Sequence, residues 1–270
     1  MVKVVKADGT SEEYSEQKII ASAKRVGVPH DLLDPMLGEI REHLFDGVST
    51  ADIFRIIQKY LEGHGVSYLS AKYNLKAALS ELGPSGYPFE KFIAELLTAE
   101  GYVCETNKSI PGKCVTHEVD VLAQKEGVTY FIEAKFHKNV SQRSDVRVAL
   151  YIYGRYLDIS DAHQGKGPTR PWIVTNTRFS SDAVNFATCR NLRITSWGYP
   201  KGDGIMDLIE RTKLHPITML PVLTEEDKRR LLAVGCVTCQ QLKENESLVE
   251  LVPRERLMAA IELAAKICQR

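Results

Sequence analysis

The chain lacks any long hydrophobic run and any excess of charge of one sign. No apolar stretch in its 270 residues approaches the ~20 residues of a bilayer-spanning helix. The N-terminal residues MVKVVKADG have no apolar core of the kind found in signal peptides. These absences predict a cytoplasmic protein without a membrane partner. The 35 basic and 35 acidic residues cancel to zero formal charge, so attraction to DNA would have to come from a local patch.

The sequence also lacks a disulfide framework and a Walker loop. Its six cysteines are scattered, and a reducing compartment would leave them as thiols. Cys236 and Cys239 have a zinc-like spacing, but no second pair of cysteines or paired histidines follows to complete four ligands. Gly165-Lys166 lacks the glycine required five positions earlier, where Ser160 stands. A disulfide scaffold and a P-loop hydrolase are therefore excluded.

Residues 116–138 predict a β-hairpin. β-Branched and aromatic residues flank the polar turn Lys125-Glu126-Gly127. A turn centred on Glu126 and Gly127 sets Asp120 opposite Glu133. Strand side chains alternate between faces, so Lys135 shares the face of Glu133. Two carboxylates and an ammonium group therefore converge.

Three charges on one face of an apolar hairpin predict a divalent metal site. Two carboxylates can hold Mg²⁺ or Mn²⁺, which takes its remaining ligands from water and phosphate oxygens. The metal lowers the pKa of a bound water, and Lys135 can orient that nucleophile or offset charge on the phosphate. The predicted chemistry is phosphodiester hydrolysis. The other interpretation is a surface ion-pair cluster on an edge strand.

The pattern Asp120, then Glu133-Ala134-Lys135, resembles the core of the PD-(D/E)xK nucleases, and its flanks resemble the Mrr-like (type IV) restriction endonucleases. The resemblance implies that Asp120, Glu133 and Lys135 are catalytic and that Asp120 and Glu133 bind the metal. Glu90, in a Phe-Glu pair on an opening helix, is implied as a further metal ligand. DNA is the implied substrate.

Other flanking motifs extend this resemblance over roughly residues 86–212. Thr175-Asn176 and Phe179-Ser180 stand where family members have them, on a later strand and helix. His117-Glu118 precede Asp120 in place of the Gly-containing approach common in the group. A role for His117 or Glu118 is left open.

Residues 86–215 predict an α/β sandwich around a mixed sheet, in the order helix, three strands, helix, strand, helix, strand. A polar excursion is expected over 107–115. Helical spacing over 143–159 is carried by Val146, Leu150, Tyr153 and Leu157. Basic residues gather beyond the predicted site and are candidates for DNA phosphate contacts: Lys135, His137, Lys138, Arg143 and Arg147.

Residues 1–84 predict a small α-helical domain that opens with a short β-hairpin turning at Asp8-Gly9. Helices are expected over 15–26, 31–44, 51–65 and 67–82, the third capped by Thr50 or Ser49. Residues 83–86, Gly-Pro-Ser-Gly, are expected to form a linker.

The order of motifs in this domain resembles an ATP-cone, a regulatory nucleotide-binding module. The resemblance implies ATP or dATP as an effector, bound through Lys6, Glu12, Lys18 and Thr50. Lysine charges and helix N-termini suit phosphate groups. Ala7 stands where the family usually has arginine. A domain that only dimerises is the alternative.

Residues 222–270 predict a small helical tail. Gly235, between two short helical patterns, resembles the turn of a helix-hairpin-helix, whose amides would contact a DNA backbone. The alternative is a packing or oligomerisation appendage.

The sequence as a whole predicts a multi-domain α/β protein that acts as a metal-dependent DNA endonuclease under nucleotide control. A homodimer, which would cut both strands, fits this prediction. The alternative function is a nucleotide-responsive DNA-binding regulator with an inactive nuclease fold.

Overall fold

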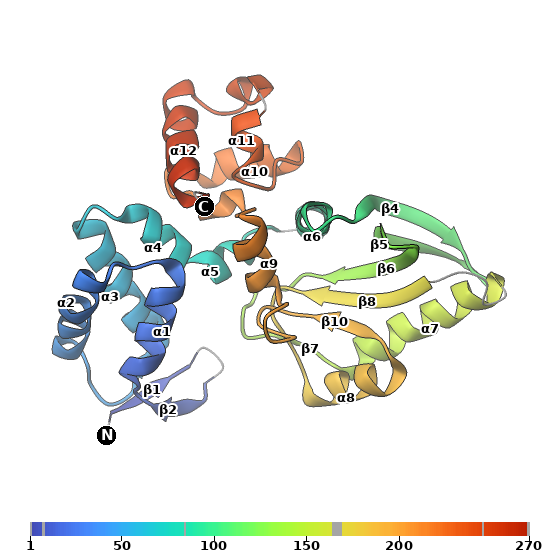
Figure 1. The fold of residues 1–270 in the computed structure, drawn as a ribbon, viewed down its shortest axis with the longest axis horizontal. Helices are drawn as coiled ribbons and strands as arrows, with labels where there is room; N and C mark the ends of the chain where they lie inside the picture. Colours follow the sequence, from blue (N-terminus) through green and yellow to red (C-terminus); the bar gives the residue numbers. More distant parts are fainter. Residues whose placement is uncertain (1, 7–8, 84, 164–168, 245, 269–270) are drawn as a thin grey trace.

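The computed structural model describes residues 2–6, 9–83, 85–163, 169–244 and 246–268. In chain order, these form a helical N-terminal domain, an α/β sandwich and a helical C-terminal domain (Figure 1). Ala7, Asp8, Pro84 and the Gly165-Lys166 pair lie outside the described residues. Within those ranges, no helix combines the length and apolar character needed to cross a membrane.

The N-terminal domain contains the predicted hairpin, formed by β1 (Lys3–Val5) and β2 (Ser11–Glu13). A further strand, β3 (Val48–Ser49), pairs in parallel with β1. The sequence did not indicate β3, because two residues carry no periodicity. The helices of this domain are α1 (Glu16–Val26), α2 (His30–Glu42), α3 (Thr50–Gly63), α4 (Ser67–Tyr73) and α5 (Leu75–Leu79).

The structure decides which residue caps α3 and divides the last predicted helix of this domain in two. Ser49, not Thr50, caps α3, because its hydroxyl accepts a hydrogen bond from the Asp52 amide at 3.0 Å. The single helix predicted over 67–82 is wrong, since Asn74 separates α4 from α5. The break lets α5 leave the N-terminal domain, and Leu75 and Leu79 pack into the main core of the molecule.

The central domain has the predicted order of elements. It comprises α6 (Tyr87–Ala99), β4 (Val103–Pro111), β5 (Thr116–Lys125), β6 (Val128–Lys135), α7 (Val146–Ala162), β8 (Thr169–Thr175), α8 (Ser181–Arg190), β10 (Arg193–Thr195) and α9 (Ile205–Thr212). The sheet order is β10-β8-β6-β5-β4, antiparallel from β4 to β6 and parallel from β6 to β10. The prediction of a sandwich with a central mixed sheet is confirmed.

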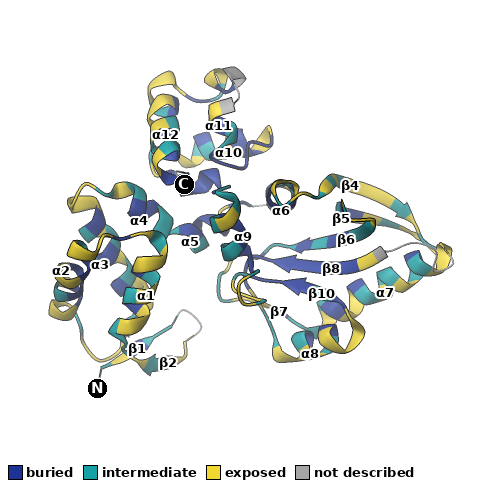
Figure 2. Ribbon diagram, viewed as in Figure 1, coloured by how far each residue is buried: buried dark blue, intermediate teal, exposed yellow. Residues whose placement is uncertain are grey.

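Helices cover both faces of this sheet, as Figure 1 shows. Phe89 and Phe92 of α6 pack with Val121, Ile132 and Trp172 on one face. On the other face, Ile152 of α7 packs against the sheet. Strand β8 is consequently mostly buried and β6 has buried and intermediate residues, whereas α7 exposes much of its outer surface (Figure 2). Such two-sided burial accounts for the near-continuous apolar run in β8.

The polar excursion expected over 107–115 is wrong for its first half. Strand β4 continues to Pro111, and Lys108 pairs with Val119 of β5. Asn107 adopts a φ of 53°, which interrupts the strand without ending it. β4 is an edge strand, where polar residues face water, and the sequence resembles a loop for that reason.

The C-terminal domain packs against both other domains. Its helices are α10 (Glu225–Ala233), α11 (Gln241–Glu244) and α12 (Arg254–Ile267). The Thr218 hydroxyl donates to the Ala78 carbonyl at 2.6 Å, and Lys228 pairs with Glu81 at 3.2 Å. Gln241 donates to Glu95 of α6 at 3.0 Å. One continuous apolar core runs from α4 and α5 through α6 into α12.

The Gly235 turn packs against α6, and the DNA contact expected of it stays a prediction. Gly235 has the expected positive φ of 78°. The amides of Val237 and Thr238 donate to the Gln241 side chain at 2.7 and 3.0 Å. A Cβ at Gly235 would lie 2.0 Å from Nζ of Lys91, so α6 closes against the turn. These two amides are engaged within the chain, which favours the packing interpretation.

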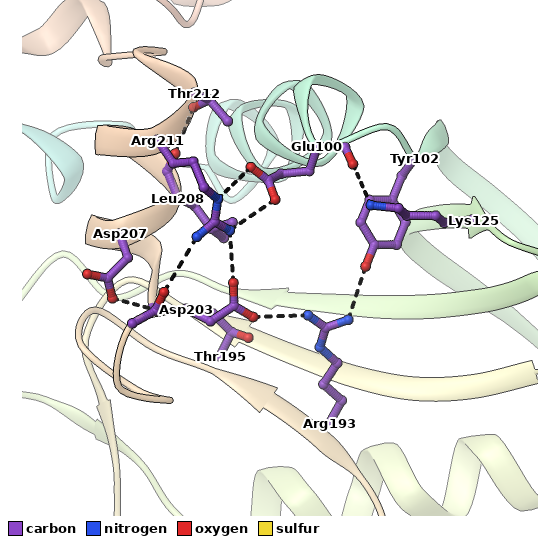
Figure 3. A network of polar contacts seen from close by, with 12 residues as sticks. Glu100, Tyr102, Lys125, Arg193, Thr195, Asp203, Asp207, Leu208, Arg211 and Thr212 are labelled. Atoms are coloured by element: carbon purple, nitrogen blue, oxygen red, sulfur yellow. Dashed lines mark hydrogen bonds and ion pairs between the residues drawn. The ribbon is translucent and has the colours of Figure 1, made fainter.

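An ion-pair network fastens α6 and α9 to the edge of the sheet (Figure 3). The Arg211 guanidinium donates to both carboxylate oxygens of Glu100, at 2.8 and 2.9 Å, and to Asp203 at 2.9 Å. Asp203 also accepts from Arg193 at 3.3 Å, and Lys125 donates to the Glu100 carbonyl at 2.7 Å. The two carboxylates raise the pKa of Arg211 further above its ordinary value. Arg211 therefore joins two elements distant in sequence.

We predict that Arg211→Met destabilises the protein. The change removes a bidentate pair and leaves Glu100 and Asp203 without their shared cation, which should lower the free energy of unfolding by about 1–3 kcal/mol. Urea denaturation measures the free energy of unfolding of wild type and variant. Arg254→Met, on the exposed first turn of α12, is the control and should change it by less than about 0.5 kcal/mol. Equal effects would show that the network adds nothing.

Candidate active site

The β5–β6 hairpin has the predicted turn and register. Glu126 and Gly127 form the turn, with φ values of 51° and 75°, and Lys125 pairs with Val128. Pairing runs as far as Val121 and Ile132, although both strands continue. The same register sets Asp120 opposite Glu133 just beyond the last pair. Both carboxylates therefore lie where the hairpin opens.

Asp120 bridges this opening. Its Oδ2 accepts a hydrogen bond from the Ala134 amide at 2.8 Å. Burial, followed by the charge of Glu133, raises the pKa of Asp120 to about 6. The Ala134 amide and Arg155 oppose this rise without cancelling it. The carboxylate is thus held in a site where its negative charge is poorly compensated.

Glu133 is held from the opposite side, by helix α7. Arg155 Nη1 donates to Glu133 Oε2 at 2.6 Å, and these two side chains are 13% and 20% exposed. The same guanidinium donates to the Glu118 carbonyl. Arg155 therefore fixes the direction of the Glu133 carboxylate and supplies one positive charge to the site.

Glu90 reaches the same site from α6. Burial, followed by the charges of Asp120, Glu133 and Glu118, raises the pKa of Glu90 to about 7. A Cβ at Gly86 would lie 2.9 Å from Oε1 of Glu90, so this glycine leaves room for the carboxylate. The carboxylates of strands β5 and β6 therefore act electrostatically on the carboxylate of Glu90.

Lys135 lies at the end of β6, on the face that carries Glu133. The strand is clamped directly beyond it. Asn176 accepts a hydrogen bond from the His137 amide at 2.8 Å and donates to the His137 carbonyl at 2.7 Å. Asn176 is buried and belongs to the Thr175-Asn176 motif. Its two bonds hold the backbone that positions Lys135.

Sequence reasoning missed Arg155. The predicted apolar stripe of helix 143–159 included Leu150 and Leu157, but these are 50% and 46% exposed. The face turned toward the sheet instead carries Ala149, Ile152 and Ile159, all buried. Arg155 lies three residues after Ile152 and four before Ile159 and therefore shares this inward face. The signal available in the sequence was an arginine at the helical spacing of Ile152 and Ile159.

Two of the predicted phosphate contacts, His137 and Arg147, interact with other side chains of the protein, and so does His117. His137 is 7% exposed, and its Nε2 lies 2.9 Å from the Ser144 hydroxyl. Arg147 pairs with its neighbour Asp145. His117 lies 2.8 Å from Asp158 of α7. His137 is wrong as a DNA contact because it is buried, and His117 contributes to packing between the sheet and α7.

The predicted nucleotide ligands also lie close together. Glu12 pairs with Lys6 at 2.7 Å and with Lys18 at 2.8 Å. Both lysines lower the pKa of Glu12, Lys18 by the larger amount. A cavity of about 210 Å³ is lined by Glu12, Lys18 and Thr50, together with apolar and aromatic side chains of α1, α3 and α4. Lys6 lies outside this lining.

Two protein families match the sequence. Residues 83–209 match the Mrr-type catalytic family, described as Restriction endonuclease. Residues 215–268 match the family described as AF1548-like, C-terminal. The first match spans all of the candidate active-site residues, and the central domain is therefore a restriction endonuclease domain. The N-terminal 82 residues lie outside both matches.

Individual relatives agree with these matches. An uncharacterized protein from Archaeoglobus fulgidus is 39% identical over 150 residues, which are 56% of this chain and 83% of the relative. The crystal structure titled protein of unknown function AF1548 is 35% identical, with a TM-score of 0.59 over 68% of this chain and 98% of that one. Can2 from Sulfobacillus thermosulfidooxidans, solved with cyclic tetra-adenylate, is 9% identical with a TM-score of 0.31, too low to establish a shared fold.

We predict that Glu90→Gln stabilises the protein at alkaline pH in EDTA. Folding raises the pKa of Glu90 from an ordinary 4.5 to about 7. Its contribution to stability is therefore fully present below the unfolded pKa and is lost as pH rises through the folded pKa. The neutral amide avoids this loss. After allowance for solvent screening, the gain should be on the order of 1 kcal/mol, or about 2–4 °C.

The measurement is the unfolding temperature of wild type and variant at pH 4.5 and pH 8.5. The gain should be present at the higher pH and absent at the lower one. Glu42→Gln, an exposed position at the end of α2, should show no pH-dependent gain. A Glu90→Gln effect of the same size at both pH values would contradict a raised pKa of Glu90 in the folded protein.

Proposed function

The chain belongs to the AF1548-like family and carries a restriction endonuclease domain, and we propose that it is a metal-dependent DNA endonuclease. One observation carries this proposal: the β5–β6 register sets Asp120 opposite Glu133 where the hairpin opens, with Lys135 two residues farther along the same strand and with both carboxylates acting on Glu90 of α6. The raised pKa values of Asp120 and Glu90 support a site built for a cation, because a cation relieves carboxylate repulsion.

The donor set fits a divalent cation of the Mg²⁺ or Mn²⁺ type. Carboxylate oxygens are its preferred ligands, and Mg²⁺ keeps several waters while using one or two carboxylates. Within the described ranges, no group of three or more His, Cys, Asp or Glu side chains is placed to hold a metal ion. Asp120 and Glu133 therefore form the proposed minimal pair, with Glu90 beside them. The cation would supply Lewis-acid activation of water and charge neutralisation at the phosphate.

The remaining steps fall to side chains of the chain itself. Lys135 would orient the attacking water and offset the negative charge that develops on the phosphate. Asn176 would keep Lys135 in position through the His137 backbone. Arg155 would hold Glu133 in place until substrate and cation arrive. Substrate phosphates on either side of the cut could contact Lys138, which is exposed just beyond the site.

We predict that plasmid nicking requires Mg²⁺ or Mn²⁺ and stops in EDTA. Lys135→Ala and Asp120→Asn should each lower the nicking rate by at least about 100-fold, because each loses charge stabilisation in the transition state. Lys113→Ala, an exposed lysine of the same domain, should cut at the wild-type rate. Cutting by Lys135→Ala at that rate would remove the assignment.

The alternative is a DNA-binding regulator with an inactive nuclease fold, and the Arg155–Glu133 pair favours it. That pair is largely buried at 2.6 Å and competes with a cation for the Glu133 carboxylate. A regulator would retain duplex DNA in a gel-shift assay and nick it with neither Mg²⁺ nor Mn²⁺. The expected homodimer stays a prediction.

We further propose that the N-terminal domain binds ATP or dATP as an effector. The 210 Å³ cavity combines Lys18, which pairs with Glu12, with aromatic walls from Tyr14, Phe54 and Tyr73, and Glu13 also lines it. The Tyr14 hydroxyl is buried and has no hydrogen-bond partner among the described residues. A ligand with ring atoms and polar groups would satisfy both features.

We predict that calorimetric titration of the full chain with ATP or dATP gives a binding isotherm. Lys18→Ala should weaken binding by about tenfold, the loss of one charge-assisted contact of about 1.4 kcal/mol. Lys24→Ala, an exposed lysine on the same helix α1, is the matched control. No binding of either nucleotide to the wild type would remove the effector proposal and leave a domain whose role is dimerisation or packing.

A further inference from the structure

A second cavity lies between the N-terminal domain and the nuclease domain. It measures about 260 Å³, and its lining includes Lys6, Thr50, Lys76, Ser141, Arg143 and Arg178. Lys6 and Lys76 come from the N-terminal part of the chain, and the two arginines come from the nuclease domain. The described residues that line it include four cationic side chains and no carboxylate. We call it the cationic cavity.

The two arginines stand side by side. Arg143 of β7 (Arg143–Ser144) is in parallel register with Arg178 of β9 (Arg178–Phe179). Lys76 lies near them, since burial, followed by the charge of Arg178, lowers the pKa of Lys76. Cationic side chains from three separate elements therefore line one cavity.

The cationic cavity adjoins the aromatic cavity of the N-terminal domain. Thr50, the first residue of α3, lines both. One cavity therefore offers aromatic and apolar walls together with Lys18, Glu12 and Glu13, and the other offers positive charge. A ligand with an aromatic ring system and a polyanionic tail matches this pair of cavities, whereas the evenly spaced phosphates of duplex DNA would use only the charged one.

The arginines are adjacent to groups that hold the catalytic strand. Ser144 follows Arg143, and its hydroxyl lies 2.9 Å from the buried ring of His137. Arg178 follows Asn176 by two residues, and Asn176 binds the backbone of His137 at both its amide and its carbonyl. A ligand on these arginines would therefore contact segments that position the strand end carrying Lys135.

We propose that the cationic cavity binds the polyphosphate of a nucleoside triphosphate whose base occupies the aromatic cavity, so that Arg178 and Arg143 of the nuclease domain contact the effector directly. The inference rests on the proposed nucleotide-binding function. It adds the coupling between domains: the phosphates bridge the two domains, and a nucleoside monophosphate offers a single phosphate to the cationic cavity.

The test is calorimetric titration of the full chain with ATP, AMP and inorganic triphosphate. Wild type should bind ATP at least tenfold more tightly than AMP. Arg178→Gln and Lys76→Gln should each weaken ATP binding about tenfold and leave AMP binding within about twofold, since each removes one charge-assisted phosphate contact. Arg178→Lys, which keeps the charge, should restore most of the ATP affinity.

Arg190→Gln, at the exposed end of α8, is the matched control and should bind ATP as wild type does. Unfolding temperatures within about 2 °C of wild type would establish that the variants are folded.

Three outcomes would overturn the inference, and they are distinguishable. ATP binding unchanged in both Arg178→Gln and Lys76→Gln, with Lys18→Ala still impaired, would reject the bridge and leave the nucleotide site. No nucleotide binding to wild type, whether or not triphosphate binds, would reject the effector function itself. Loss of duplex DNA binding without loss of ATP binding in Arg178→Gln would identify the cavity as a DNA contact.

Discussion

Burial of carboxylates at the open end of the β5–β6 hairpin, together with their mutual repulsion, is the constraint on which the candidate active site depends. Asp120 and Glu133 come from adjacent strands, and Glu90 comes from a helix on the sheet. The surrounding structure opposes their separation. The Ala134 amide holds Asp120, and Arg155 holds Glu133. A fold that keeps such charges together without full compensation sacrifices stability at the place where a cation would restore it.

The C-terminal domain explains how the other two domains remain in contact. Its helices share one apolar core with α4, α5 and α6, and hydrogen bonds from Thr218 and Gln241 reach the N-terminal and central domains respectively. The amides of the Gly235 turn serve this packing. A domain that fixes α5 also fixes Lys76, which faces the nuclease domain across the cationic cavity.

The zero net charge of the chain conceals strong local asymmetry. Carboxylates dominate the opening of the hairpin, while lysines and arginines dominate the cavity between domains. Each cluster has the sign that suits a different proposed ligand: a divalent cation at the first and a polyphosphate at the second. The two lie at opposite ends of a short set of contacts through His137, Ser144 and Asn176. Local fields, not total charge, therefore indicate what this protein binds.

The sequence by itself determined the hairpin and the order of helices and strands. Glu126-Gly127 set the turn, alternation set the faces, and Asp120 opposite Glu133 followed, because each of these depends on neighbours along the chain. Only the tertiary structure decided that Arg155 faces Glu133, since Leu150 and Leu157 made the wrong face of α7 look buried. It also decided that β3 joins β1 and that Lys6, Lys76, Arg143 and Arg178 share a cavity. Such contacts between residues distant in sequence depend on which face of a helix turns inward and on how distant elements pack. Local periodicity encodes neither.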